Sequence, residues 1–204
     1  APSIPIGRVP AKSNAQIRTY LSKVIGFELT TNLGIWSKNL FHISGGTDFY
    51  QQIKHKDKIN SYRTIALGKY FGGRVFSYYK GSNEPVETPD LDSIHNIVNN
   101  GVSLITYYGH ASSSVLEVDI GEACGDPTKN DDGYKNKDKY PLMIINGCYA
   151  GNMFDRTNLS PMGNRWLFCP ERGALGFLAH TDLGIEEPLH SFTSSFYKTA
   201  CREK

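Results

Sequence analysis

The sequence lacks a long hydrophobic run: among its 204 residues, no stretch approaches the roughly 18 consecutive apolar residues of a membrane-spanning helix. It also lacks a basic run, because its 22 Lys and Arg are interleaved with 20 Asp and Glu. We therefore expect no membrane span, and no nucleic-acid partner, whose phosphates a basic patch would bind. A signal peptide is missing too, and the opening Ala1-Pro2-Ser3 indicates a processed product or a fragment of a longer protein.

Cysteine is too sparse for a disulfide scaffold in a chain of this length, and no C-x-x-C pair occurs. One or two disulfides are possible, but the spacing does not select the partners and leaves the redox compartment open. Cys124 with His95 or Cys169 could suggest zinc, although the paired spacing of a zinc site is absent. The four cysteines are Cys124, Cys148, Cys169 and Cys201.

What the sequence does contain is an alternation of helical and extended segments over residues 1–204, which predicts a single α/β domain. Helices are expected where apolar residues recur at helical spacing between capping residues. The predicted helices are Asn14 to Glu28, Leu91 to Asn99, Asn164 to Glu171 and Leu189 to Lys198, and the strands of the first half are Asn39 to Ser44 and Arg74 to Tyr79.

Three further strands are apolar on both of their pleat faces. They are Val102 to Tyr108, Pro141 to Ile145 and Ala174 to Ala179. Strands of this composition are typical of the centre of a parallel sheet that helices cover on both sides. The order strand–helix–strand therefore predicts an open α/β sheet.

The segment from Glu122 to Lys139 is polar, rich in turn residues and without periodicity, so we expect a long surface loop. Its acidic residues could hold a structural calcium ion, since hard cations take several carboxylates. Their spacing is not that of an EF-hand, and a solvated acidic loop is the alternative interpretation. The candidate ligands are Asp119, Glu122, Asp126, Asp131 and Asp132.

Two of the apolar strands end alike, one at Gly109-His110 and the other at Gly147-Cys148. Sites in open α/β sheets form at the carboxyl ends of the strands, so adjacent parallel strands would bring this thiol and imidazole together. Such a pair is the minimal machinery of a cysteine hydrolase: Cys148 attacks a carbonyl, and His110 protonates the leaving amine and then activates water. Backbone N–H groups of Gly109, Ala111 and Cys148 could bind the oxyanion.

The pattern alone also allows a structural interpretation. A cysteine at the end of an apolar strand is often a small buried hydrophobic residue, and an isolated histidine is often an ordinary surface or core residue.

Four segments together resemble one family. Tyr107-Tyr108-Gly109-His110-Ala111 resembles the histidine strand end of the gingipain-type cysteine peptidases, family C25. Asn146 to Phe154, NGCYAGNMF, resembles their cysteine segment. Arg172 to Leu178, RGALGFL, and Gly7 to Ala11, GRVPA, resemble a later strand and the entry of their domain.

The resemblance implies a caspase-like three-layer sandwich, with a mostly parallel central sheet flanked by helices. It also implies a cysteine endopeptidase that acts on polypeptides, requires no cofactor, and is secreted or displayed on a bacterial surface. Components of type IX secretion are then possible partners. An alternative within the family is the type IX signal peptidase or sortase, in which an acceptor amine competes with water. A non-catalytic caspase-like binding or scaffold module is another alternative.

Ala111 departs from the family pattern, which usually has glycine after the histidine. Alanine is tolerable there only if the backbone φ is negative. By the same resemblance, Asp48 is a loose candidate for the acid that orients His110, although an aspartate in a turn is an equal interpretation. Substrate contacts are expected from Thr181 and Asp182, after the last strand, and from Tyr149. An acid at position 182 would favour Lys or Arg at the P1 position of the substrate.

Overall fold

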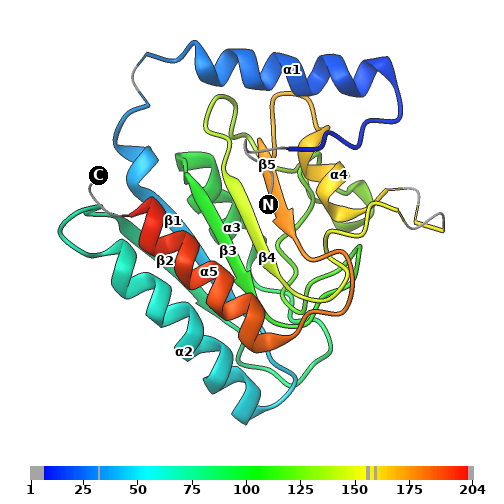
Figure 1. Ribbon diagram of the computed structural model, residues 1–204. Coiled ribbons are helices and arrows are strands. Elements are labelled where there is room, and N and C mark those ends of the chain that lie inside the picture. The colour runs from blue at the N-terminus through cyan, green and yellow to red at the C-terminus, as the bar shows by residue number, and fades with distance from the viewer. Residues whose placement is uncertain (1–6, 32, 155–156, 159, 202–204) are drawn as a thin grey trace.

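The computed structural model describes residues 7–31, 33–154, 157–158 and 160–201 (Figure 1). Its centre is a five-stranded sheet in the order β2-β1-β3-β4-β5, in which every neighbouring pair is parallel. This confirms the predicted α/β class and the parallel central sheet. The strands are β1 (Asn39–Ser44), β2 (Arg74–Tyr79), β3 (Leu104–Tyr108), β4 (Leu142–Asn146) and β5 (Gly176–Ala179).

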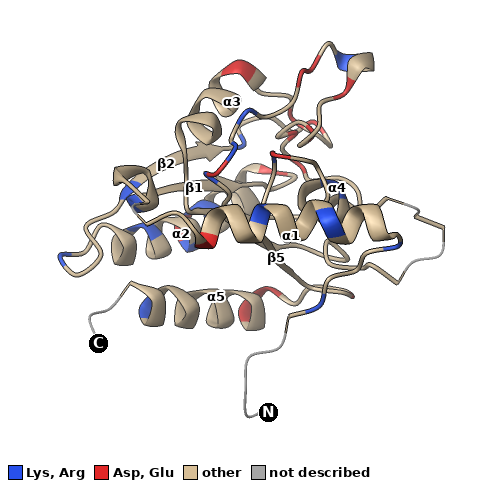
Figure 2. Ribbon diagram, turned by 90° about the horizontal axis from the view of Figure 1, so that it is seen from above, with Lys and Arg blue, Asp and Glu red and all other residues tan. Residues whose placement is uncertain are grey.

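Helices cover both faces of the sheet, and Figures 1 and 2 show them as two layers with the strands between. Helices α2 (Phe49–Ala66) and α5 (Glu186–Ala200) lie on one face, where Ile144 of β4 packs with Tyr62 and Tyr197. Helices α3 (Leu91–Asn100) and α4 (Met162–Leu167) lie on the other, where Ile145 packs in one core cluster with Trp166. Successive apolar residues of β4 thus enter opposite cores, which explains why this strand is apolar throughout.

Helix α1 (Asn14–Glu28) crosses the end of the sheet away from the carboxyl ends of the strands (Figure 1). Ser13 caps it by accepting a hydrogen bond from the backbone N–H of Gln16. The buried Lys23 ammonium donates to the carbonyls of Trp166, Arg172 and Ala174, at 3.2, 2.9 and 2.9 Å. The helix is therefore fixed to the turn that leads into β5, and the opposite end of the sheet stays accessible. Two short 3-10 helices, η1 (Ile35–Lys38) and η2 (Pro127–Lys129), complete the described elements.

Helix α2 was not predicted from the sequence. It begins after Asp48, whose carboxylate accepts hydrogen bonds from the backbone N–H groups of Tyr50 and Gln51 at 2.9 and 3.0 Å. Its buried residues include His55 and Lys58 beside Ile59 and Tyr62. Because polar residues fill part of its buried face, the helix shows almost no apolar stripe in the sequence.

A disulfide joins Cys124, in the long polar loop, to Cys169, just after α4. Pairing of these two cysteines removes them as thiolate ligands, so the suggested zinc site does not form in this structure. His95 instead lies 3.5 Å from a carboxylate oxygen of Asp131. The loop itself is confirmed: between residues 122 and 139 the only regular element is η2.

The surface carries both signs of charge, interspersed over the molecule (Figure 2). None of the helices in the described ranges is long and apolar enough to cross a membrane.

Removal of the disulfide should destabilise the fold measurably. Replacing Cys124 and Cys169 together with alanine should lower the free energy of unfolding by about 2–4 kcal/mol, since the crosslink closes a long loop in the unfolded chain. Chemical denaturation measures this change, with Cys148→Ala as the control because that cysteine is not crosslinked. Equal unfolding midpoints for the double variant and the control would contradict the expectation.

Candidate active site

The ends of β3 and β4 place His110 and Cys148 at the same level of the sheet. Tyr108 pairs with Asn146 in the parallel register, and each candidate residue follows two positions later. The turns touch directly: a Cβ added to Gly147 would lie 2.5 Å from the Ala111 Cβ and 3.0 Å from the Gly109 oxygen. The predicted meeting of the two strand ends is therefore present, and Gly147 is required for it.

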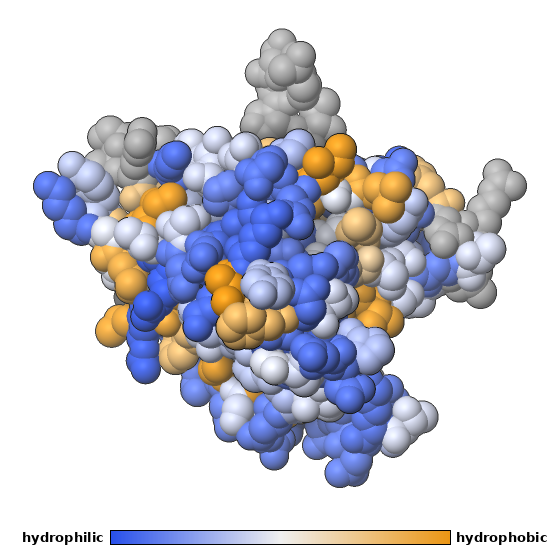
Figure 3. All heavy atoms as spheres, turned by 90° about the horizontal axis from the view of Figure 1, so that it is seen from below, coloured by the Kyte–Doolittle hydropathy of each residue, from blue (hydrophilic) through white to orange (hydrophobic). Residues whose placement is uncertain are grey.

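The site lies on the face toward which the strands point. Figure 3 views the molecule from this side and shows hydrophobic patches set in a largely hydrophilic surface. Exposed apolar side chains from two segments beside the strand ends are Phe49, Tyr50, Leu183 and Ile185.

Cys148 is half-buried and lies against the backbone of Gly184, whose N–H is 3.4 Å from the Sγ atom. The next residue, Tyr149, has a φ of 56°, a left-handed conformation that is unfavourable for a tyrosine. Hydrogen bonds hold this turn: the Tyr149 N–H donates to the Asp182 carbonyl and the Gly151 N–H to the His180 carbonyl, both at 2.9 Å. The chain is thus turned sharply just after the thiol, as is common for strained backbone at functional sites.

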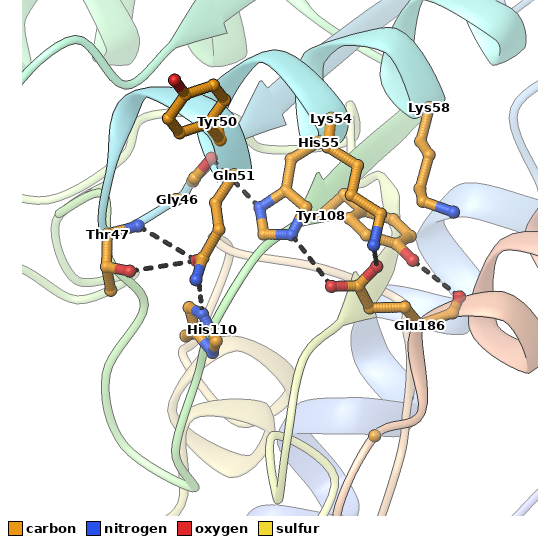
Figure 4. Close-up of polar contacts among 12 residues, drawn as sticks. Gly46, Thr47, Tyr50, Gln51, Lys54, His55, Lys58, Tyr108, His110 and Glu186 are labelled. Carbon is orange, nitrogen blue, oxygen red and sulfur yellow. Dashed lines mark hydrogen bonds and ion pairs between the residues drawn. The ribbon is translucent and has the colours of Figure 1, made fainter.

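The imidazole of His110 is exposed, and its Nε2 lies 2.9 Å from the Oε1 atom of Gln51 (Figure 4). The same oxygen accepts from the backbone N–H of Thr47 at 3.3 Å and is 3.0 Å from its hydroxyl. A backbone N–H can only donate, so the Gln51 atom at this point must be the amide oxygen. Nε2 must then carry the hydrogen, and Nδ1 is left as the basic nitrogen of the ring.

The orienting role that the sequence suggested for Asp48 is not supported. Its Oδ1 atom is occupied by two backbone N–H groups of α2, as described above, and the imidazole pairs with Gln51 three residues later. Gln51 was missed because it is not titratable and because the helix that carries it was not predicted. The one usable signal was Asp48 itself, a helix-capping residue at the start of the correct segment.

Two of the three predicted oxyanion donors have a free N–H. Gly109 does not, because its N–H donates to the Asn146 carbonyl at 3.1 Å. No hydrogen bond to a described residue engages the N–H groups of Ala111 and Cys148. Ala111 is also absent from the described residues with positive φ, so alanine fits here without backbone strain. An oxyanion-binding role for these two N–H groups remains a prediction.

A second histidine, not predicted to be part of the site, lies beside the first. His55 is buried, its ring centroid is 6.1 Å from that of His110, and its Nδ1 is 3.2 Å from the Gly45 carbonyl oxygen. Burial lowers the pKa of His55, although the carboxylate of Glu186, 3.8 Å from its Nε2, acts in the opposite direction. Glu186 also pairs with Lys54, so its charge is balanced within the protein (Figure 4).

The three predicted substrate contacts surround the cysteine turn. The Asp182 carboxylate accepts from the Leu183 N–H at 2.7 Å. Partial desolvation of the phenol and, after it, the negative charge of Asp182 raise the pKa of Tyr149. Thr181 lines a small pocket with Ala150 and Gly151. A larger pocket of about 370 Å³ begins beside Gly184, and its side chains are mostly apolar: Leu178, Leu183, Ile185, Leu189 and Phe192 among them. A substrate role for Thr181, Asp182 and Tyr149 remains a prediction.

The suggested calcium ligands do not gather around one point. Lys129 pairs with Asp119 and Arg165 with Glu122, each at 2.7 Å. Within the part of the chain that the structure describes, no three His, Cys, Asp or Glu residues form a group that could hold a metal ion.

Comparison with known proteins identifies the family. The family model "Peptidase family C25" matches residues 1–204. The chain belongs to peptidase family C25. The recognition from sequence is thereby confirmed, and membership of C25 implies a cysteine peptidase. A comparison with curated proteins gave no match.

Solved structures of C25 peptidases share the fold. The complex of Porphyromonas gingivalis RgpB pro- and mature domains matches with a TM-score of 0.75 and 16% identity over 95% of this chain and 44% of that one. The Arg-specific cysteine proteinase gingipain R (RGPB) matches with a TM-score of 0.72 and 15% identity, over 96% and 46% of the two chains. The chain therefore spans less than half the length of these structures. At this identity the likeness shows the caspase-like fold alone.

The thiols of this C25 chain should differ in reactivity. Iodoacetamide in limited amount should label Cys148 before Cys201, because Cys148 lies at an accessible turn while burial raises the pKa of the Cys201 thiol. Peptide mapping by mass spectrometry measures the two sites in the same sample. Preferential labelling of Cys201 would contradict the choice of Cys148 as the candidate nucleophile, and labelling of Cys169 would contradict the disulfide.

The tautomer of His110 offers a separate test. Its neutral ring should carry hydrogen on Nε2, and Gln51→Ala should give a mixture of tautomers because the fixed acceptor is lost. Nitrogen-15 NMR of the imidazole reads this directly. Gln52→Ala is the matched control, since Gln52 bonds instead to the carbonyls of Gly46 and Ser82. A mixture already present in the unsubstituted protein would contradict the assignment.

Proposed function

We propose that the chain carries the catalytic centre of a cysteine endopeptidase, with Cys148 as nucleophile and His110 as general acid and base. The observation that carries this proposal is the contact between the two strand-end turns: the β3–β4 register sets both residues at one level, and Gly147 packs against Gly109 and Ala111. Membership of family C25 supports a cysteine peptidase activity. The assignment of that activity to Cys148 and His110 is our proposal.

These residues can carry out peptide hydrolysis in two stages, acylation of Cys148 and hydrolysis of the resulting thioester. The Cys148 proton passes to His110 Nδ1, and the sulfur adds to the scissile carbonyl, whose oxygen takes the negative charge. The N–H groups of Ala111 and Cys148 are free to stabilise that oxyanion. The imidazolium then protonates the leaving amine, and a thioester with Cys148 remains. His110 finally takes a proton from the attacking water and returns it to the Cys148 sulfur as the C–S bond breaks, which releases the carboxylic acid and regenerates the thiol.

Gln51 supports both protonation states of the ring. Its oxygen accepts the Nε2 hydrogen of neutral His110 and can keep that bond in the imidazolium. A neutral amide stabilises the cation less than a carboxylate would, since charge-assisted hydrogen bonds are stronger. Gln51 therefore acts mainly by fixing the ring and its tautomer.

The place of action that we propose is outside the cytoplasm, on the bacterial surface or in the surrounding medium. The disulfide Cys124–Cys169 supports this, because such bonds persist in oxidising compartments. Substrates are polypeptides, as for peptidases in general. Partners from type IX secretion remain a prediction that rests on the sequence resemblance.

Hydrolysis of fluorescently labelled casein tests the proposal. Cys148→Ala should abolish turnover, and His110→Ala should reduce it by about 100-fold or more, the contribution typical of an acid–base group. Both variants should retain the circular dichroism spectrum of the parent, because neither side chain lies in a core cluster.

Three outcomes separate the alternatives. Equal activity of Cys148→Ala and the parent would rule out the proposed nucleophile. Mass spectra that show an added amine in place of hydrolysis would indicate transpeptidation of the sortase type. A folded parent without activity and without selective labelling of Cys148 would favour a binding module.

A further inference from the structure

Glu117 lies directly beneath the turns that form the site, although the proposed chemistry does not use it. It is 5% exposed, in the loop that follows β3. Its Oε2 atom accepts hydrogen bonds from the backbone N–H groups of His110 at 2.9 Å and of Gly46 at 2.8 Å. One carboxylate oxygen thus joins the turn that follows β3 to the turn that follows β1.

Glu117 is also linked to the backbone carbonyl of His110 through the hydroxyl of Tyr107. The Tyr107 hydroxyl donates to the His110 carbonyl at 2.6 Å and accepts from the Glu117 N–H at 3.2 Å. Both backbone polar groups of His110 are therefore tied to Glu117, one directly and one through Tyr107. The backbone of the histidine has little freedom to move independently of this acid.

Two glycines make room for this carboxylate. A Cβ added to Gly45 would lie 2.3 Å from Oε2, and one added to Gly109 would lie 2.9 Å from it. Both distances are too short for atoms that are not bonded, so no other residue type fits at either position without displacement. The two glycines directly follow the last residues of the neighbouring strands β1 and β3.

Burial of the Glu117 carboxylate without a cationic partner among the described residues lowers the stability of the fold. Among the described residues, no lysine, arginine or histidine forms an ion pair with Glu117. Its Oε1 atom is buried without a hydrogen-bond partner. A buried acid with incomplete compensation reduces stability, and such groups concentrate at functional sites.

We propose that Glu117 is a positioning residue that fixes both ends of the His110–Gln51 hydrogen bond. It holds His110 through its backbone, and it holds Gly46, the neighbour of Thr47, which in turn binds the Gln51 amide oxygen. Through these contacts it sets the direction of the imidazole and its tautomer. The effect on catalysis rests on the proposed function; the effect on the imidazole does not.

Glu87 provides a matched control. It is a second carboxylate that accepts from two backbone N–H groups at a strand end, those of Gly81 at 3.0 Å and Ser82 at 2.6 Å after β2. Its side chain makes no contact with His110 or Gln51 in the described part of the chain. Its backbone N–H donates to the Glu117 carbonyl at 2.8 Å, and Glu87→Ala keeps that N–H. Glu87→Ala should therefore cost stability without disturbing the imidazole.

The experiment compares Glu117→Ala, Glu117→Gln and Glu87→Ala in the full chain. Nitrogen-15 NMR reads the His110 tautomer, and casein hydrolysis gives kcat and KM separately. Glu117→Ala should show a tautomer mixture and a kcat lower by about 10- to 100-fold, the usual effect of a misplaced catalytic group, with KM nearly unchanged. Glu117→Gln keeps an acceptor oxygen of the same reach, and should retain the Nε2 hydrogen and kcat within about threefold. Glu87→Ala should have the same His110 tautomer and the same kcat as the parent.

Three results would overturn the proposal. One is a uniform Nε2–H tautomer with unchanged kcat in Glu117→Ala. Another is an equal loss in Glu87→Ala, which would mark a purely structural effect. If Glu117→Ala does not fold, a tautomer mixture in folded Glu117→Gln would show that hydrogen bonding by this side chain does not set the ring. Absence of casein hydrolysis in the parent would count against the proposed function alone, since the NMR readout requires no turnover.

Discussion

The parallel pairing of β3 with β4 is the constraint on which the rest of the site depends. Because Tyr108 and Asn146 are partners, the turns after the two strands leave the sheet side by side, and the candidate residues His110 and Cys148 each follow two positions later. Asn146 strengthens the junction: its amide donates to the Tyr107 carbonyl, and its carbonyl accepts from the Gly109 N–H. A shift of one residue in this register would separate the imidazole from the thiol.

Backbone strain and a buried carboxylate near this junction reduce stability. Tyr149 adopts a left-handed backbone conformation after the cysteine, and Glu117 is buried without an ion-pair partner among the described residues. The apolar cores on both faces of the sheet supply the stability that tolerates these features. The helices that cover the sheet lie on its two faces, and α1 crosses the end away from the carboxyl ends of the strands (Figure 1).

The sequence was most informative where local chemistry decides the structure. Continuous apolar runs predicted β3 and β4, and their parallel pairing brings the turns that carry His110 and Cys148 into contact as expected. The catalytic role of the two residues stays a prediction. The helix Asn14–Glu28 was predicted with the bounds that the structure shows. Helix α2 was missed because charged and polar residues, such as His55 and Lys58, are buried by partners distant in the sequence. Gln51, Glu117 and the Cys124–Cys169 pair depend on the same long-range contacts, which no local pattern encodes.

The most direct test of the account is crosslinking with 1,3-dibromoacetone. This three-carbon reagent first alkylates a reactive thiol and then joins it to a second nucleophile within reach. Peptide mapping should find the Cys148 sulfur bridged to the imidazole of His110, and His110→Ala should carry only a single-ended adduct on the cysteine. A bridge from Cys148 to any other side chain, or no bridge in the unsubstituted protein, would contradict the proposal that these two residues form one catalytic centre.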